Sequence, residues 1–212
     1  MTVYLSPDLG VFDWVEHGFA TRHAMDWFDQ ARLAHLKQIH SDAVVVAGGA
    51  GHWGEGDALI TNIPGVLVGI RTADCVPLLI VDPAHRAVAA VHAGWRGSAA
   101  KIAVTTLRAM AREFGTEAEE VSVAIGPGIG SCCYEVSEDI AGRFAEWFPE
   151  NAGRGGKQNI DLTEANRRQM IAAGVRRIHS GAPCTGCDGN FHSFRRDGEA
   201  AGRMYSVVGV RA

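Results

Sequence analysis

Residue types that bind metal ions occur in three short phrases of the sequence. His40 follows KQI, Cys75 follows RTAD, and His92 opens the phrase HAGWRG. Thiolate and imidazole are ligands that zinc prefers, and a set of three protein ligands leaves one position free for water or substrate. Each phrase comes at the end of a predicted strand, where α/β proteins place their sites. These residues are candidate ligands and catalytic groups of an open zinc site.

The spacing of the three residues does not join them into one site. The gaps of 35 and 17 residues are not those of a metal finger. A cysteine after a buried strand is by itself more often a small apolar residue than a ligand. A metal-free hydrolase, with Cys75 as nucleophile and His92 as base, would use the same residues. Copper also binds cysteine and histidine, so the ligand types allow Cu²⁺ as well as Zn²⁺.

A glycine-flanked turn is a candidate anion site. Gly94 and Gly97 enclose Arg96 where a predicted strand gives way to a helix, and free N–H groups and the helix dipole attract phosphate at such a place. A tight turn with a surface arginine would explain the same residues. Arg71 and Arg195 are further candidates for binding phosphate or ribose, because a guanidinium binds anions in a planar, bidentate way. The alternative for both is a solvated surface position.

The other cysteines form a less informative pattern. Cys184 and Cys187 make a CxxC motif, which can be half of a zinc site or a redox motif. Only His192 lies nearby as a third ligand, and the sequence contains no second CxxC. We therefore interpret this motif as structural and expect it to be neither catalytic nor required for metal. The adjacent pair Cys132 and Cys133 is interpreted as packing.

The pattern of apolar residues predicts interleaved strands and helices. Short runs rich in β-branched residues and bounded by Gly, Pro or Asp predict buried strands at 43–47, 66–70, 78–81, 87–91, 121–125 and 204–210. Helical periodicity follows at 98–114, after Ser137, and at 161–174, with Ser98 and Asp161 as expected N-caps. We expect a mixed α/β (α+β) fold of layered mixed sheets covered by helices. No repeat or linker divides the chain, so we expect one domain over residues 1–212.

The composition argues against nucleic acid and membranes as binding partners. The chain of 212 residues is 47% hydrophobic and has a formal net charge of −4, which gives no electrostatic footprint for nucleic acid or a membrane surface. Small molecules are the expected partners, and the oligomeric state is not indicated. Residues 1–14 contain no leader pattern, and Arg71 and Asp74 interrupt the most apolar stretch. With an odd count of five cysteines, a cytoplasmic location is expected.

Six longer phrases form a pattern of their own. They are KQIHSD at 37–42, GDALIT at 56–61, RTADCVPLLI at 71–80, AAVHAGWRG at 89–97, AIGPGIGSCCYEV at 124–136 and FHSFRRDGEAAGR at 191–203. In this order they resemble the laccase-domain family, also called the multicopper polyphenol oxidoreductase family, which includes the peptidoglycan editing factor. The resemblance extends from about residue 15 to the C-terminus. It implies one metal site at His40, Cys75 and His92, and purine nucleoside phosphorylase activity on adenosine, inosine and methylthioadenosine, accompanied by adenosine deamination.

Rival functions remain open at the level of sequence. Copper-dependent oxidation of polyphenols fits the family's name, but a coupled copper cluster needs many converging imidazoles, and the nine histidines include no His-x-His pair. A zinc-activated water could instead cleave an amide of a cell-wall precursor. A binding module with a structural zinc would require a fourth protein ligand. Zinc suits deamination directly, because it lowers the pKa of a bound water to about 7.

Overall fold

Two six-stranded mixed sheets form the framework of the computed structural model, which describes residues 3–24, 27–151 and 153–212. The first sheet contains, in spatial order, β1 (Val3–Tyr4), β2 (Val15–Ala20), β14 (Met204–Val210), β7 (Leu67–Thr72), β3 (Leu33–Lys37) and β5 (Gly51–Glu55). The second contains β13 (Arg177–His179), β10 (Ser122–Ile125), β8 (Val76–Asp82), β9 (Ala87–Ala93), β6 (Ala58–Thr61) and β4 (Val44–Val46). A ribbon of β11 (Glu135–Val136) and β12 (Gln158–Asn159) lies apart from both.

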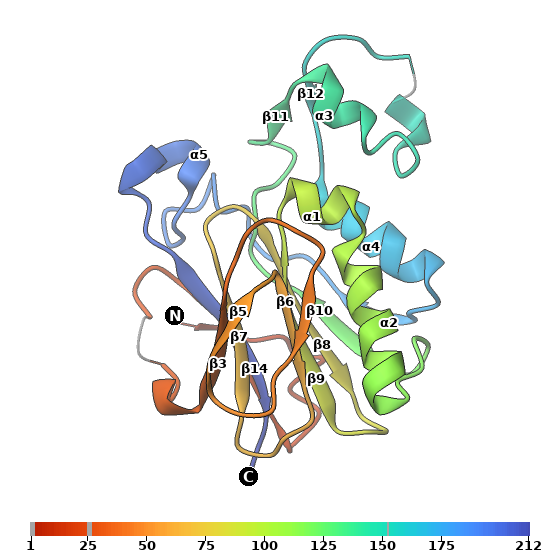
Figure 1. Ribbon diagram of the computed structural model, residues 1–212. Helices are drawn as coiled ribbons and strands as arrows, with labels where there is room; N and C mark the ends of the chain where they lie inside the picture. The colour runs from red at the N-terminus through yellow and green to blue at the C-terminus, as the bar shows by residue number, and fades with distance from the viewer. Residues whose placement is uncertain (1–2, 25–26, 152) are drawn as a thin grey trace.

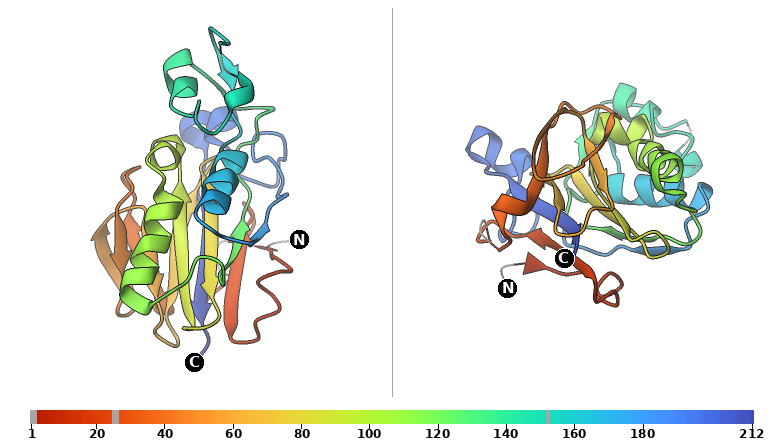
Figure 2. Two further views of the ribbon diagram at one scale, coloured as in Figure 1. Left: turned by 90° about the vertical axis from the view of Figure 1, so that its right-hand side faces the viewer. Right: turned by 60° about the horizontal axis from the view of Figure 1, so that its bottom comes forward.

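Short helices and turns complete the described chain. The α-helices are α1 (Trp95–Ala99), α2 (Ile102–Phe114), α3 (Glu138–Gly142), α4 (Leu162–Ala172) and α5 (Phe194–Asp197), and the 3₁₀ turns are η1 (Gln30–Arg32), η2 (Pro149–Asn151) and η3 (Gly198–Ala200). Figures 1 and 2 show α2 and α4 side by side over one face of the second sheet, while its other face meets the first sheet. The expected mixed fold of layered sheets covered by helices is therefore confirmed.

The second sheet is buried on both faces, which explains why its strands read as unbroken apolar runs. Every residue of β8 and β9 is buried. Leu78 and Ile80 pack with Met110 of α2, whereas the alternate residues Leu79 and Val81 pack against the first sheet. The side chains of a strand point to opposite faces in turn, so one strand supplies both cores. This doubly covered hairpin is the rigid support of the candidate site.

The helix expected at 98–114 is divided, and this part of the prediction is wrong. Lys101 adopts a left-handed conformation with φ 62° and ψ 41°, which separates α1 from α2. Ser98 is not an N-cap but a buried residue of α1, whose hydroxyl accepts a hydrogen bond from Asn166 at 2.8 Å. That contact holds α1 against α4. Asp161 does cap α4 as expected, because its carboxylate accepts the N–H of Glu164 at 2.8 Å.

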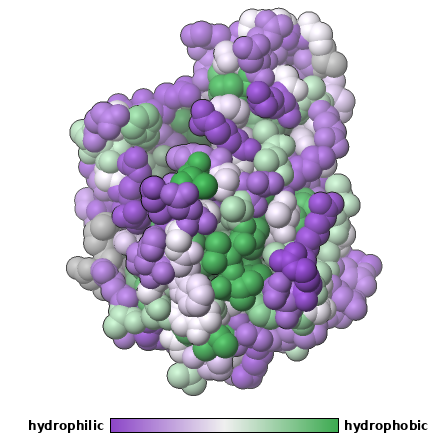
Figure 3. Space-filling view, in the orientation of Figure 1, coloured by the Kyte–Doolittle hydropathy of each residue, from purple (hydrophilic) through white to green (hydrophobic). Residues whose placement is uncertain are grey.

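The described surface is mixed in polarity. Figure 3 shows hydrophilic side chains over most of one face, with an apolar area near its middle. Within the described residues, no helix has both the length and the apolarity needed to cross a bilayer.

Candidate metal centre and its pocket

His40, Cys75 and His92 meet at the end of the sheets where β9 leads into α1, and Figure 1 shows α1 there, below the ribbon of β11 and β12. Their candidate ligand atoms all lie within 4.8 Å of one another, and the two imidazole rings stand edge to face with centroids 4.9 Å apart. Antiparallel pairing of β8 with β9 sets Pro77 opposite His92, which brings the preceding Cys75 beside the histidine. His40 reaches the same place from the loop after β3.

A buried carboxylate organises this centre. Asp57 accepts the backbone N–H groups of Ile39 at 3.3 Å, His40 at 3.0 Å and Ser41 at 2.6 Å. Three successive N–H groups can point at one acceptor because His40 is left-handed, with φ 59°. Asp57 also accepts the Ser41 hydroxyl at 2.7 Å and contacts Nδ1 of His92 at 2.7 Å. This one side chain therefore positions both histidines.

The charges at the centre favour a metal-binding donor set. Burial opposes ionisation of Asp57, but its hydrogen bonds to His92 and Ser41 hold its pKa at about 2. With the Nδ1 proton of His92 directed to that carboxylate, Nε2 is left as the ligand atom. Burial likewise opposes ionisation of Cys75, yet hydrogen bonds from His40 and His92 lower the thiol pKa to about 6. The centre thus offers the Cys75 thiolate at neutral pH, beside the rings of His40 and His92.

His92 is strongly basic in this setting. Burial acts to lower its pKa, but Asp57 and Cys75 outweigh that effect and raise it to about 9. The Cys75 thiolate and the His92 imidazolium therefore lie next to each other. A divalent cation that binds between them would displace the proton from His92. Gly94 packs closely behind these side chains. A Cβ at this position would lie 3.0 Å from Cys75 Sγ and 3.2 Å from His40 Cδ2. These donors fit zinc, and copper by the same ligand types.

A pocket of about 520 Å³ opens over the three residues. Four cationic side chains line it: Lys37, Arg71, Arg195 and Arg203. Asp74 is the one carboxylate in the described lining, and it is buried and already bonded to Thr185 Oγ1 at 2.7 Å and to the Arg195 N–H at 2.6 Å. The pocket therefore carries an excess of positive charge and is suited to an anion.

Two aromatic residues, Tyr134 and Phe194, also line the pocket. The guanidinium of Arg195 lies 5.2 Å from the centroid of the Tyr134 ring. Burial, followed by the negative charge of Cys75, raises the pKa of the Tyr134 hydroxyl to about 12. That hydroxyl stays protonated at neutral pH and can donate a hydrogen bond to a ligand.

The structure separates the predicted substrate-binding residues into two groups. Arg71 and Arg195 line the pocket. Arg96 is outside its described lining: it is exposed, and its guanidinium stacks on the Trp95 ring at 4.4 Å. Gly94 packs against the candidate ligands Cys75 and His40, and a Cβ at Gly97 would lie 3.0 Å from the carbonyl oxygen of Ser41. The two glycines thus allow close packing of the turn and do not line the described pocket.

Several residues of the site were missed by sequence reasoning although they lie within the recognised phrases. Asp57 belongs to GDALIT. It could have been identified from the sequence as an acidic residue directly before an apolar run that forms a buried strand. Gln38 belongs to KQIHSD and clamps the backbone of Arg71, accepting its N–H and donating to its carbonyl, each at 2.8 Å. Tyr134 and Arg203 belong to the last two phrases and line the pocket.

The expectation that no ligand pair accompanies Cys184 and Cys187 is wrong. Cys132 and Cys133 lie beside them, with all four sulfur atoms within 4.8 Å of one another. The Gly-rich loop before Cys132 is paired with the CxxC segment, because Gly128 forms a parallel β-bridge with Cys184. His192, the one nearby ligand considered from the sequence, instead accepts the N–H of Gly202 at 3.2 Å.

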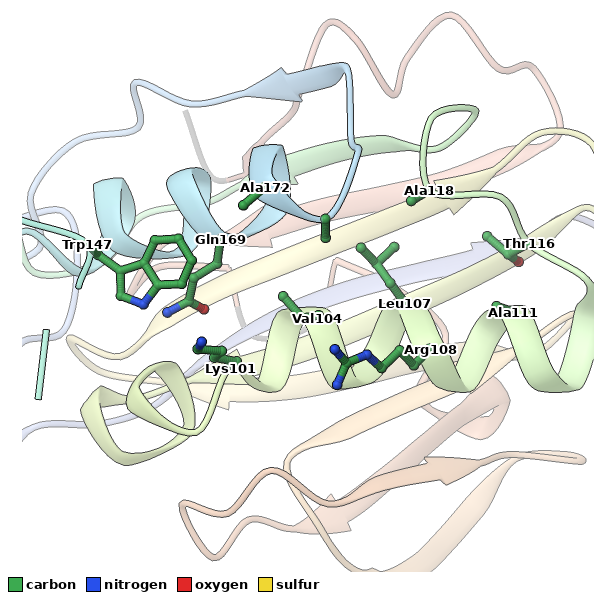
Figure 4. Close-up of a pocket in the computed structure, with 11 residues that line it drawn as sticks. Lys101, Val104, Leu107, Arg108, Ala111, Thr116, Ala118, Trp147, Gln169 and Ala172 are labelled. Carbon is green, nitrogen blue, oxygen red and sulfur yellow. The ribbon is translucent and has the colours of Figure 1, made fainter.

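A second pocket lies between α2 and α4 and has a volume of about 350 Å³ (Figure 4). Lys101, Leu107 and Trp147 are among the side chains around it. Its described lining contains no histidine, cysteine or carboxylate. It therefore lacks the metal-ligating residue types that the other pocket gathers, and the pocket over Cys75 is the candidate active site.

Comparison with known proteins agrees with the resemblance found in the sequence. Residues 15–211 match the family described as multi-copper polyphenol oxidoreductase laccase. A purine nucleoside phosphorylase of Deinococcus radiodurans is 42% identical over 84% of this chain and 70% of its own length. Adenosine deaminase RL5, from an unknown prokaryotic organism, is 37% identical over 73% of this chain and 60% of its own length.

Solved structures share the fold over nearly the whole chain. YlmD of Geobacillus stearothermophilus superposes with a TM-score of 0.88 at 27% identity, covering 100% of this chain and 97% of that one. YfiH of Bacillus licheniformis reaches a TM-score of 0.90 at 24% identity, covering 99% and 97%. From the matched phrases, the family match and the shared architecture, the chain belongs to the multi-copper polyphenol oxidoreductase laccase family.

Proposed function

We propose that this protein is a zinc-dependent purine nucleoside phosphorylase that also deaminates adenosine. The observation that carries the proposal is the set of His40, Cys75 and His92 at the base of a cationic pocket with aromatic side chains. Relatives named purine nucleoside phosphorylase and adenosine deaminase support the choice of substrate class. Adenosine, inosine and methylthioadenosine are the proposed nucleosides.

The pocket residues suit phosphorolysis. In this reaction phosphate attacks C1′ of the ribose as the purine leaves, so an enzyme must hold an anion beside a sugar that develops positive charge. Arg71 and Arg195 are the proposed phosphate ligands, because bidentate guanidinium contacts orient an oxyanion strongly. Tyr134 and Phe194 offer ring faces to the purine, and the protonated hydroxyl of Tyr134 can donate to its leaving nitrogen.

The same site suits deamination. His40, Cys75 and His92 are the residues that would hold zinc, and Asp57 keeps His92 in the tautomer that binds through Nε2. When bound, zinc would act as a Lewis acid that activates water for attack on a purine ring carbon. The fit is better for one zinc than for a coupled copper cluster, because the imidazoles gathered at this centre in the described chain are those of His40 and His92.

The setting of the reaction is proposed on the same grounds. The five cysteines are all free thiols, which suits a reducing compartment such as the cytoplasm. The proposed partners are small molecules, namely purine nucleosides and phosphate.

The test is a product analysis with matched arginine variants. Zinc-loaded protein is incubated with adenosine, with and without phosphate, and ribose 1-phosphate, adenine and inosine are measured. Arg71→Ala should raise the KM for phosphate about tenfold or more, since it removes a charge-assisted contact. Arg112→Ala is the control, because this exposed arginine of α2 pairs with its neighbour Glu113 and is not part of the described pocket lining.

Two further variants sharpen the assignment. Cys75→Ala should abolish inosine formation and lower the zinc content, because it removes the charged ligand. Arg96→Ala decides whether the exposed arginine near the pocket also holds phosphate, and a smaller effect than that of Arg71→Ala is expected from its position. If zinc-loaded protein releases no ribose 1-phosphate from any purine nucleoside at saturating phosphate, the phosphorylase proposal fails.

A further inference from the structure

Four cysteines from two distant segments form a compact cluster. Cys187 Sγ lies 3.4 Å from the sulfur of Cys132 and 3.3 Å from that of Cys133, and all four sulfurs lie within 4.8 Å of one another. In a tetrahedral zinc site the Zn–S bonds are about 2.3 Å long, which places neighbouring sulfurs about 3.8 Å apart. The spacing in the cluster is therefore that of a four-sulfur cage of zinc size.

Local backbone geometry is adapted to bring the two segments together. The N–H of Thr185 donates to the carbonyl of Gly128 at 3.0 Å, next to the bridge between Gly128 and Cys184. A Cβ at Gly186 would lie 2.9 Å from Cys133 Cβ, and a Cβ at Gly130 would lie 3.2 Å from Cys184 Cβ. Side chains at these two positions would push the sulfur-bearing segments apart, so glycine is what permits the cluster.

The cluster also has polar support for a thiolate. The N–H of Gly130 donates to Cys184 Sγ at 3.1 Å. The turn at 184–188 is closed by the N–H groups of Cys187 and Asp188, which both donate to the carbonyl of Cys184. The CxxC is thus folded into a tight turn, and the N–H group that faces its Cys184 sulfur comes from Gly130 on the other segment.

We propose that Cys132, Cys133, Cys184 and Cys187 bind a second zinc ion, distinct from the one proposed at the pocket. With four protein ligands the site is closed, and its role is structural. The proposal is independent of which reaction the pocket catalyses. It also assigns a partner to each member of the CxxC and of the adjacent cysteine pair.

A zinc ion here would brace one wall of the pocket. Tyr134 directly follows the Cys132–Cys133 pair, and Arg195 Nη1 donates to the carbonyl oxygens of Cys133 at 3.3 Å and Glu135 at 3.0 Å. On the other segment, Thr185 Oγ1 donates to Asp74 at 2.7 Å, one residue before Cys75. The four-cysteine site therefore joins the segments that carry an aromatic and a cationic residue of the pocket.

Metal counting tests the proposal without reference to activity. Protein produced with zinc under reducing conditions is measured by native mass spectrometry, and about two zinc ions per chain are expected. The double variant Cys132→Ser/Cys187→Ser should retain about one, and so should Cys75→Ala, which removes a ligand of the other centre. A zinc content of about one in the unaltered protein that persists in the double variant would overturn the proposal.

A measurement on the unaltered protein covers the case in which a variant does not fold. Cadmium replaces zinc in both centres, and ¹¹³Cd NMR separates a metal bound by four sulfurs from one bound by a single sulfur. Two resonances are expected, with the more deshielded one from the four-cysteine site. Absence of the more deshielded, four-sulfur resonance, or a disulfide joining Cys187 to Cys132 or Cys133 in protein kept reduced, would refute the four-cysteine site.

Discussion

The two sulfur-containing clusters lie at the same end of the molecule but are built in opposite ways. His40, Cys75 and His92 are positioned by the ends of buried strands and by the carboxylate of Asp57, and they leave one side open to the pocket. The four cysteines belong to loops and are brought together by close approaches at Gly130 and Gly186. Three donors on rigid strands are typical of a catalytic metal site, whereas four donors on loops are typical of a structural site that links two segments.

This difference predicts how each centre depends on its surroundings. The proposed pocket centre is shaped by protein hydrogen bonds before any ion arrives, because Asp57 already fixes the loop of His40 and the ring of His92. The proposed structural centre holds four thiols close together on two loops, which are joined by the backbone contacts of Gly128 with Thr185 and of Gly130 with Cys184. Three predictions test this contrast, taken from the largest expected effect to the smallest.

The largest effect is expected from Asp57→Asn. The amide cannot accept from His92 and all the N–H donors that now face the carboxylate, so zinc affinity at the pocket centre should fall about 10- to 100-fold. Competition with a chelator measures this loss, and the four-cysteine site should keep its zinc. Asp82→Asn is the matched control, because Asp82 is an equally buried carboxylate that accepts from Thr116 at 2.6 Å at the opposite end of β8. Equal loss of zinc in both variants would contradict the role of Asp57.

A pair of glycine variants should affect the two centres selectively. Gly94→Ala places a methyl group 3.0 Å from Cys75 Sγ, and Gly186→Ala places one 2.9 Å from Cys133 Cβ. Each should weaken zinc at its own centre by about tenfold and spare the other, as native mass spectrometry during chelation would measure. Gly142→Ala in α3 meets nothing within 4 Å and serves as control. A loss at both centres from either variant would mean that they are not independent.

The smallest effect is a difference in thiol titration in metal-free, reduced protein. The pKa is about 6 for Cys75 and about 7 for Cys184, and is raised for Cys132, Cys133 and Cys187. Only the thiolate is alkylated, so the rate at each cysteine rises with pH through its own pKa. Peptide mapping after brief alkylation from about pH 5 to about pH 9 should show Cys75 reacting at the lowest pH and Cys184 next. Five coincident profiles would contradict these environments.

Much of the second sheet could be predicted from the sequence. The runs at 78–81 and 87–91 became β8 and β9, because strands covered on both faces are continuously apolar. Strand β5 was missed because all five of its residues are exposed and show no apolar alternation. The break between α1 and α2 at Lys101 carries no glycine or proline that would have predicted it, and the contact of Ser98 with Asn166 on α4 is tertiary information.

The candidate centres show a similar division. Residue type suggested His40, Cys75 and His92, but only a resemblance joined them, since the pairing of β8 with β9 that makes them neighbours is tertiary information. Asp57 was missed because its partner His92 is 35 residues away. The four-cysteine cluster was missed for the same reason, because its two halves are more than fifty residues apart in sequence.

The complete burial of the β8–β9 hairpin has a consequence for how the pocket centre opens. Amide hydrogens in such strands exchange with solvent only when the molecule unfolds globally, whereas those of exposed loops exchange through local fluctuations. His92 lies on this slowly exchanging hairpin and Cys75 directly before it, while His40 is exposed on a loop. The proposed ion is therefore held by two static donors and by a third, His40, that withdraws only when the hydrogen bonds between its loop and Asp57 open. Its exchange with solvent should follow the opening rate of the loop at 38–42.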